Sequence, residues 1–537
     1  MKLEEYDYIV VGSGSAGCTV AARLAEDGHA SVLVVEAGGS DRNPLISIPL
    51  AWGLVFRHRL FDWDYWTEPE QALNGRRIEC ARGRVIGGSS SVNGMVYARG
   101  IAQDYDGWRE RWGLEGWDFN GVLPYFQKSE SWPKAGHGGR GNHGPLHLTE
   151  LQPTDPLVPS FLEAVREAGF GRTDDYNGSD AVGFGAIQAT IYQGRRWSTA
   201  AAYLRPALGR PNLRLRTRAL AMRVVIERGR AVGVECIVRG KRQLLRARKE
   251  VILSAGVFNS PQLLMLSGVG PADELARHSI PVHAALSGVG QNLHDHLALE
   301  VRWERRDESP LRRALRIDRA ARAVLQAYFF GNGIASTMPL GAIGLVRSRP
   351  ELEHPDAQLL LGTAPLTAKP YLNPFVRPYV NAFTVKGMLV KPESRGRVRL
   401  RSADPTQAPM IEQRLLSAAP DLRSSRVLLE MIRALGSQPA LQRHIARELA
   451  PGPSVISADS MEAYLRSTVS TLHHPVGTCR MGSEGDEGAV LDARMRVRGI
   501  DGLRVIDASG MPEITRGPIN GPVIMMAEKA AADILSG

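Results

Sequence analysis

The sequence predicts an α/β protein (α+β overall) built around a Rossmann-like nucleotide-binding domain. The N-terminal segment reads as strand, helix and strand, with an aromatic and β-branched run over residues 6–11, an Ala-rich run over 15–27 and a β-branched run over 31–36. A glycine-rich turn lies between the first strand and the helix. The chain has 537 residues, more than one hydrophobic core usually organises, so two domains are expected.

Two further apolar runs read as strands of the same sheet. They are residues 250–254 (Glu-Val-Ile-Leu-Ser) and 503–506 (Leu-Arg-Val-Ile), and a helical pattern over 523–535 closely follows the second. Long segments with a different residue pattern separate these strands along the chain. We therefore expect a nucleotide-binding domain that is discontinuous in sequence.

The composition argues against several classes of partner. Lys and Arg total 66 against 56 Asp and Glu, a net charge of +10, but the excess is spread along the chain without a basic tail or a known nucleic-acid-binding pattern. We expect no nucleic-acid partner. The four cysteines, Cys18, Cys80, Cys236 and Cys479, lie far apart with no CxxC pair, which argues against a zinc cluster or disulfide framework and fits a reducing compartment.

The N-terminus and the hydropathy pattern bear on location. The first residues are acidic and lead into a short apolar run, unlike a signal peptide. No uninterrupted apolar run approaches the roughly 20 residues that a membrane helix needs. We therefore expect a cytoplasmic protein that is at most peripheral to the inner face of a membrane.

An arginine-rich helix is expected between Ser309-Pro310 and Gly331. Ser suits an N-cap, Pro the first helical position and Gly a helix stop. The arginines are at positions 312, 313, 316, 319 and 322. A membrane surface or an anionic substrate could bind such a helix, but we favour a solvated arginine face over a buried stripe of Leu, Ala and Val.

The glycine-rich turn predicts a dinucleotide site. Gly12 permits the tight turn, Gly14 lets the backbone approach a pyrophosphate, and Gly17 allows close packing of helix on strand. The helix that Ser15 opens directs its N-terminus at the phosphate charge. Glu36, followed by Ala37, ends the second strand, where its carboxylate can accept hydrogen bonds from a ribose.

Four longer motifs distinguish between the cofactors that share this turn. They are residues 82–99 (RGRVIGGSSSVNGMVYAR), residues 256–270 (GVFNSPQLLMLSGVG), residues 473–482 (HHPVGTCRMG) and residues 503–529, from LRVIDAS to NGPVIMMAEK. In this order they resemble the motifs of the glucose-methanol-choline (GMC) oxidoreductases, in the branch of choline and sorbose dehydrogenases. The resemblance covers nearly the whole chain.

The resemblance implies FAD as the cofactor. Beyond the glycine-rich turn, the implied contacts are Gly88, Ser89, Asn93, Gly94, Ala255, Asp507 and Ala508. An Asn that only stabilises a turn is the alternative reading of Asn93. Some relatives tether FAD through a histidine at the position of Val92, so we expect FAD to be bound non-covalently here.

The resemblance also implies the division of the chain. We expect residues 1–155, 196–300 and 465–537 to form the FAD-binding domain. Residues 156–195 and 301–464 are expected to form a substrate-binding domain built on an antiparallel sheet with helices.

The reacting groups follow from the chemistry and from the same resemblance. Oxidising an alcohol needs a base for the hydroxyl proton, and a histidine suits this role because its ordinary pKa is near neutrality. By similarity to the family, His474 is the base, flavin N5 accepts the hydride, and Asn520 donates a hydrogen bond to the substrate oxygen. His473 is a core histidine in the interpretation we favour. The pair His294 and His296 has no third ligand cluster nearby, so we expect no metal site.

One segment of the sequence bears on the substrate. Choline-oxidising relatives carry a Glu in an E-x-G-G-F segment, whereas the comparable residues 339–347 (PLGAIGLVR) contain no acid. We therefore expect a neutral primary alcohol, oxidised to the aldehyde. Choline dehydrogenase proper and a redox-neutral flavin lyase of the same fold are the alternatives, and the electron acceptor stays open between oxygen, a quinone and another carrier.

Overall fold

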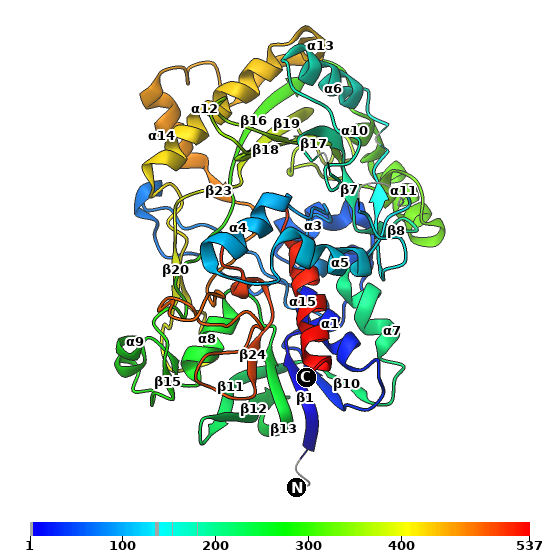
Figure 1. Cartoon of the computed structure of the whole chain (residues 1–537). Helices are drawn as coiled ribbons and strands as arrows, with labels where there is room; N and C mark the ends of the chain where they lie inside the picture. Colours follow the sequence, from blue (N-terminus) through cyan, green and yellow to red (C-terminus); the bar gives the residue numbers. More distant parts are fainter. Residues whose placement is uncertain (1–3, 135–138, 153, 180) are drawn as a thin grey trace.

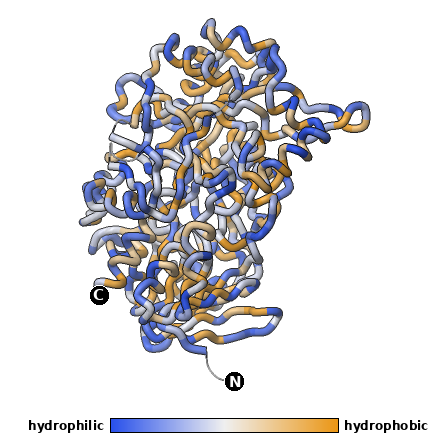
Figure 2. The backbone as a smooth tube through the Cα atoms, turned by 90° about the vertical axis from the view of Figure 1, so that its right-hand side faces the viewer, coloured by the Kyte–Doolittle hydropathy of each residue, from blue (hydrophilic) through white to orange (hydrophobic). Residues whose placement is uncertain are grey.

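Two sheets divide the molecule into two halves (Figure 1). The computed structural model describes residues 4–134, 139–152, 154–179 and 181–537. The lower half in Figure 1 contains both ends of the chain, and the upper half is made of its middle segments. Hydrophobic stretches of backbone run through the interior of both halves (Figure 2).

The first sheet contains the strands that the sequence predicts. Its order is β10-β2-β1-β13-β12-β11, with β24 paired to β13. The bounds are β1 Glu4–Val11, β2 Val32–Val35, β10 Leu213–Arg216, β11 Ala219–Glu227, β12 Arg230–Val238, β13 Lys241–Leu253 and β24 Leu503–Val505. The end of β13 pairs in parallel with β1 and β24, and its beginning pairs antiparallel with β12. Segments from the start, middle and end of the chain therefore meet in one sheet.

Helices from the two ends of the chain cover this sheet side by side. Helix α1 (Ser15–Leu24) packs against α15 (Asn520–Leu535), which packs in turn on α5 (Phe119–Ser129). Helix α15 begins three residues before the expected 523, so Asn520 is its first residue. The N-terminus of α15 consequently lies next to that of α1, because Ser15 Oγ donates to Asn520 Oδ1 at 2.7 Å.

The second sheet is antiparallel, as expected. Its order is β22-β16-β19-β18-β17-β6, with β23 paired to β16. The bounds are β6 Gly183–Ala186, β16 Leu297–Arg305, β17 Leu340–Val346, β18 Ala357–Gly362, β19 Ala382–Leu389, β22 Ile445–Ala450 and β23 Ser470–Thr471. Strand β16 crosses the expected domain boundary at residue 300, and the exact boundaries stay a prediction.

Alternation along β16 and β19 gives this sheet two different faces. Leu299, Val301 and Val385 belong to a buried core beneath helix α12 (Ala419–Gly436). Their neighbours Glu300 and Lys386 point the other way and line the large cavity described below. The sheet therefore presents charged side chains to the space between the two halves.

The arginine-rich segment is two helices rather than the single helix that we predicted. Helix α10 (Pro310–Ala314) has the expected Ser309 cap, and α11 (Ile317–Phe330) ends at left-handed Gly331 as expected. The helix breaks between them because Leu315 and Ile317 make backbone hydrogen bonds of 3.0 and 2.9 Å to Tyr371. The predicted burial of the apolar stripe is also wrong: Ala327 is the only buried residue of α11.

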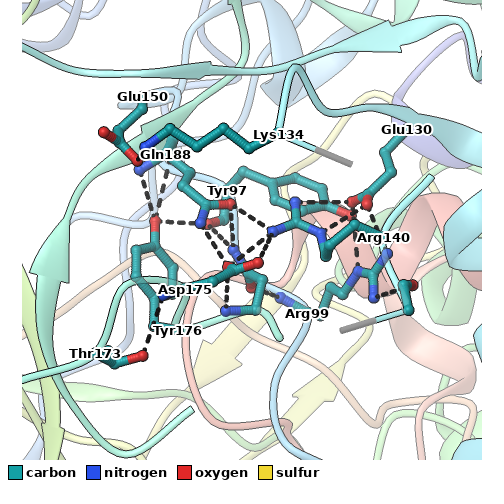
Figure 3. A network of polar contacts seen from close by, with 12 residues as sticks. Tyr97, Arg99, Glu130, Lys134, Arg140, Glu150, Thr173, Asp175, Tyr176 and Gln188 are labelled. Carbon is teal, nitrogen blue, oxygen red and sulfur yellow. Dashed lines mark hydrogen bonds and ion pairs between the residues drawn. The ribbon is translucent and has the colours of Figure 1, made fainter. Parts of the chain in front are cut away.

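A buried network of polar contacts joins Asp175 and Gln188 to Arg99, Glu130 and Arg140 (Figure 3). The Glu130 carboxylate lies between two buried arginines, 2.6 Å from Nη2 of Arg99 and 2.7 Å from Nε of Arg140. Nη1 of Arg140 also lies 2.7 Å from Oδ2 of Asp175, and Nε2 of Gln188 donates to Oδ1 of the same carboxylate at 2.7 Å. Each buried charge has a partner of opposite sign, the condition under which burial of charge is tolerated.

Candidate functional site

The three glycines of the turn after β1 occupy three different environments. Gly12 has φ +98°, and a Cβ there would lie 2.4 Å from the Ser254 carbonyl oxygen. A Cβ on Gly17 would lie 1.9 Å from the Gly12 carbonyl oxygen, so the helix packs directly on the turn. A Cβ on Gly14 would meet no atom within 4 Å. Gly14 thus faces open space at the start of α1, whose first-turn N–H groups have no side-chain cap.

Glu36 is buried at the end of β2 and braces the same turn. Its Oε2 accepts from Ser13 N at 2.8 Å and from Ser13 Oγ at 2.7 Å, and its Oε1 accepts from Gly38 N at 2.7 Å. Burial raises the pKa of this carboxyl, while the hydrogen bonds oppose that rise. Glu36 and Ala37 both line the large cavity.

The segment from Gly88 to Gly94 crosses over the dinucleotide turn. A Cβ on Gly88, where φ is +52°, would lie 2.8 Å from the Gly14 Cα, so the two glycines let the two loops touch. Asn93 Oδ1 accepts from Met95 N at 3.0 Å and from Arg196 Nη1 at 2.8 Å, which is the turn-stabilising role we gave as the alternative. Asn93 also lines the cavity, so the structure is compatible with both roles.

Asp507 ties the C-terminal strand to the turn after β13. One carboxylate oxygen accepts from Gly256 N at 2.9 Å and Ser260 Oγ at 2.6 Å, and the other accepts from Ser509 N at 2.8 Å. Ala255 and Ala508 lie beside it on the cavity wall. The carboxylate therefore holds two remote segments together at the edge of the cavity.

One cavity of about 980 Å³ contains nearly every expected site residue. It is lined by Gly12, Gly14, Ser15, Glu36, Ala37, Gly88, Ser89, Asn93, Gly94, Ala255, Asp507, Ala508, His474 and Asn520. Gly17 is the exception, because it packs against Gly12. Arg82 also lines this cavity, and its Nε and Nη2 are buried without a hydrogen-bond partner in the described part of the chain. The uncapped helix start, the Gly14 opening and this guanidinium fit a large anionic dinucleotide.

The side chain of His474 is held by a second histidine. His474 Nδ1 lies 3.0 Å from Nδ1 of His296, with the two rings at 89° to each other. His296 Nε2 lies 3.0 Å from the carbonyl oxygen of Thr515. A carbonyl can only accept, so His296 carries its proton on Nε2. Burial lowers the pKa of His296 to about 3, so its ring is neutral and its Nδ1 is an acceptor.

This arrangement fixes the tautomer of His474. Because His296 Nδ1 accepts, His474 must donate from its own Nδ1. Burial lowers the pKa of His474 well below its usual range, so this ring is also neutral near pH 7. Its Nε2 therefore carries a free lone pair on the cavity wall. A neutral imidazole with its lone pair directed by a neighbour is suited to accept a proton.

Asn520 lines the same cavity, and its amide group is oriented. Ser15 Oγ donates to Oδ1 at 2.7 Å, which leaves the NH₂ group to act as a donor. The position at the first residue of α15 also places Asn520 where the helix dipole is positive. A donor in such a place can stabilise negative charge on an oxygen.

Asp295 positions the backbone that carries both histidines of the motif. Its carboxylate accepts from His474 N at 2.9 Å and from Thr471 Oγ1. Burial raises the pKa of Asp295 to about 6. Between these two contacts His473 has φ +61°, a left-handed conformation rare for a non-glycine residue. Its ring packs edge-on to Phe56 at 5.3 Å, and its buried Nδ1 lacks a hydrogen-bond partner among the described residues.

The His294-Asp-His296 segment is engaged in hydrogen bonds. His294 Nε2 lies 2.8 Å from the Pro392 carbonyl oxygen, and Ile514 N donates to its Nδ1 at 3.4 Å. Both nitrogens of His296 are used as described above. Within the described residues no group of three His, Cys, Asp or Glu side chains could hold a metal ion.

Two parts of the site have no counterpart in our sequence prediction. His296 was considered only as a metal ligand, because a contact between residues 178 positions apart leaves no local pattern. Glu300, Arg302 and Lys386 line the cavity from the second sheet. Alternation of polar and apolar residues over 297–305 was the available signal for Glu300 and Arg302, since it predicts a half-buried strand.

The chain is similar to known proteins over nearly its whole length. Residues 6–298 and 392–527 match two family models, both described as GMC oxidoreductase. The chain is 42% identical over 531 residues to an oxygen-dependent choline dehydrogenase of Brucella anthropi, covering 99% of this chain and 96% of the relative. It is 43% identical to the protein of that name in Sinorhizobium fredii, covering 98% and 95%.

Solved structures resemble the whole chain. A pyridoxine 4-oxidase from Mesorbium loti is 32% identical with a TM-score of 0.88, covering 99% of both chains. A variant of the Aspergillus oryzae formate oxidase, studied for FAD modification, is 28% identical with a TM-score of 0.89, covering 99% of this chain and 98% of the other.

Proposed function

Because the chain belongs to the GMC oxidoreductase family, we propose that His474 and Asn520 are the catalytic pair of an alcohol oxidation. The protein is an FAD-dependent oxidoreductase that acts on CH–OH donors. FAD, when bound, supplies the acceptor for the hydride that leaves the carbinol carbon. The observation that carries the catalytic assignment is the chain of contacts from Thr515 through His296 to His474.

The cofactor would be held by the residues that line the cavity around the dinucleotide turn. Gly14 and the start of α1 would receive the pyrophosphate, and Glu36 would accept from the ribose. The segment from Gly88 to Gly94, with Ala255, Asp507 and Ala508, would hold the rest of the molecule. Val92 lines the cavity without a group that could form a covalent bond, which supports non-covalent binding.

In the proposed mechanism His474 removes the hydroxyl proton. The alcohol oxygen binds between Nε2 of His474 and the NH₂ group of Asn520. The O–H proton passes to Nε2 as the C–H bond breaks, and the alcohol becomes the aldehyde. The Asn520 amide stabilises the charge that develops on the oxygen, an interaction that is stronger in the transition state than in the ground state.

The charges on the second sheet support a neutral primary alcohol as substrate. Glu300 could pair with a quaternary ammonium, but its Oε1 lies 3.0 Å from Nη2 of Arg302. Lys386 stands opposite Glu300 in the register of β16 and β19, and no ion pair joins it to another described residue within 4.0 Å. One carboxylate thus faces two cations, so a bound trimethylammonium group would meet a surplus of positive charge. We propose that choline is a poor substrate.

Choline dehydrogenase proper is the second candidate, and the names of the relatives favour it. One anaerobic screen separates the two substrate proposals. The purified yellow protein is mixed with benzyl alcohol, short alkanols, polyols and choline, and flavin absorbance is followed. Bleaching by neutral alcohols supports our proposal, and preferential bleaching by choline supports the second candidate.

We also propose a cytoplasmic location with peripheral contact to a membrane. All four cysteines are buried and unpaired, which fits a reducing compartment.

Admitting air or a quinone after the anaerobic screen identifies the electron acceptor from the rate at which the flavin colour returns.

A further inference from the structure

Helix α11 lies at the edge of the molecule with an unusual amount of apolar surface exposed (Figure 1). Of its fourteen residues only Ala327 is buried. Phe329 and Phe330 at its end are 66% and 76% exposed. A helix of this length is marginal in water unless one face is packed, so these exposed side chains need an explanation.

The helix has two apolar faces, of which only one packs on the protein. Ala323 and Ala327 contact a small cluster with Ile48 and Ala335. The other face carries large side chains at helical spacing, and all of them are exposed: Ile317, Val324, Leu325 and Tyr328. The face with small side chains packs on the rest of the protein, and the face with large side chains points outward.

A neighbouring loop extends the same surface. Residues 366–380 are joined to the start of α11 through Tyr371, whose backbone bonds to both Leu315 and Ile317. The loop exposes Leu366, Leu372, Phe375, Val376 and Val380, and Phe375 is 84% exposed. Most of the exposed large hydrophobic residues of the described chain thus fall in residues 317–330 and 366–380, which we call the apolar edge.

Positive charge surrounds the apolar edge. Residues 309–335 contain five arginines and a single acid, Asp318, and residues 364–380 add Lys369 and Arg377 without an acid. Asp318 is itself paired with Arg316 at 2.6 Å. A second copy of the chain would bring the same cations face to face, so a symmetric dimer through this surface is disfavoured. An anionic lipid surface meets both the apolar side chains and the charge.

The active-site cavity reaches this surface. Ala320, Ala323 and Val324 of α11 and Leu366 and Ala368 of the loop line the same cavity as His474. A molecule dissolved among lipids could therefore enter the cavity without passing through bulk water. No described helix is long and apolar enough to span a bilayer, so the contact would be with the membrane surface.

We propose that α11 and the loop 366–380 form a docking surface for anionic membranes, with the phenyl rings among the lipid chains and the arginines at the headgroups. The inference specifies the peripheral location proposed above. Lipid binding is measured without turnover, so its failure is distinct from failure of the proposed alcohol oxidation.

The test is co-sedimentation of the FAD-loaded protein with vesicles. Vesicles of phosphatidylglycerol and phosphatidylcholine should bind the protein at low salt, and those of phosphatidylcholine alone should bind it much less. The double variant Phe329→Ser/Phe330→Ser should lower the partition coefficient at least about tenfold. Arg319→Gln/Arg322→Gln should weaken binding to anionic vesicles and reduce its salt dependence.

A matched control lies elsewhere on the surface. Ile456→Ser changes a side chain that is 74% exposed outside the apolar edge, and should leave vesicle binding unchanged. None of the substituted residues lines the cavity, so oxidation of a water-soluble alcohol with a soluble dye verifies that each variant is folded. The proposal fails if the wild type does not bind anionic vesicles at low salt, or if both double variants bind them like the wild type. It also fails if the serine variants convert a dimer into a monomer.

Discussion

The Nδ1 atoms of His474 and His296 lie 3.0 Å apart, although 178 positions separate the two residues in the sequence. The contact leaves Nε2 of His474 unprotonated and gives His296 a positioning role. The carbonyl oxygen of Thr515 determines the proton position on both rings.

Replacing His474 with Ala should retain FAD and slow flavin reduction roughly 10²- to 10⁴-fold, the usual contribution of a positioned base. Part of the rate should return at high pH, where alkoxide forms without help. Anaerobic stopped-flow reduction from pH 6 to 10 measures both effects. Near wild-type reduction at neutral pH would place the base elsewhere, with His473 as the next residue to replace.

The wild-type pH profile follows from the lowered pKa of His474. The neutral ring is the active form. The usual pKa of histidine is about 6.5, and burial keeps the His474 ring neutral at pH values below that. Flavin reduction should therefore be independent of this group from pH 8 down to about 6.5 and fall only at lower pH. A stopped-flow series that shows the rate already halved near pH 7.5 would contradict the assigned environment.

His296→Leu should lower the reduction rate roughly 5- to 150-fold, because the buried Nδ1–H of His474 loses its acceptor, at about 1–3 kcal/mol. His296→Asn places an amide oxygen near the former Nδ1 and should restore much of the loss. A merely structural role would show as loss of FAD or of thermal stability in both variants. Equal rates for the Leu and Asn variants would remove the positioning role.

Asn520→Ala should slow reduction by a similar factor, roughly 5- to 150-fold, since one hydrogen bond to the reacting oxygen is lost. In contrast to the His474 variant, high pH should not recover this rate, because no proton acceptor has been removed. The same stopped-flow series, with FAD content as control, compares the two. Recovery at pH 10 would mean that Asn520 acts through the base.

Lys386→Met should raise kcat/KM for choline while changing that for benzyl alcohol much less. Two charges 4 Å apart repel by about 1 kcal/mol in water and about 4 kcal/mol at an effective dielectric constant of 20, so a gain of at least roughly fivefold is expected. Burial lowers the pKa of Lys386, which reduces this repulsion toward high pH. Steady-state kinetics with both alcohols measure the ratio. A wild type that prefers choline over neutral alcohols would overturn the substrate proposal before any variant is made.

The fold was predictable where the signal is local. Strands at 6–11, 31–36, 250–254 and 503–506 carry runs of apolar residues typical of buried parallel strands, and the structure places all four in one sheet. The cap at Ser309 and the stop at Gly331 were likewise correct. The break at Leu315 was not predictable, because it depends on backbone bonds to Tyr371, which is remote in sequence.

The site divides in the same way. The structure brings His474, Asn520 and the expected cofactor residues, except Gly17, into the lining of one cavity, and their roles stay predictions until tested. The roles proposed for His296 and Lys386 were not predicted from the sequence, because these roles depend on contacts with residues that are remote in the chain. A buried histidine and a strand lysine have no distinctive neighbours along the chain.

The pairing of the first and last segments has a consequence for synthesis of the protein. Ser15 leaves the ribosome 505 residues before Asn520, yet the two side chains share a hydrogen bond in one cavity. β24 and Asp507 are also made long after β1, so the nascent chain has no complete cofactor pocket until these segments have been synthesised. We therefore expect a chain that stops before residue 507 to be purified without flavin colour.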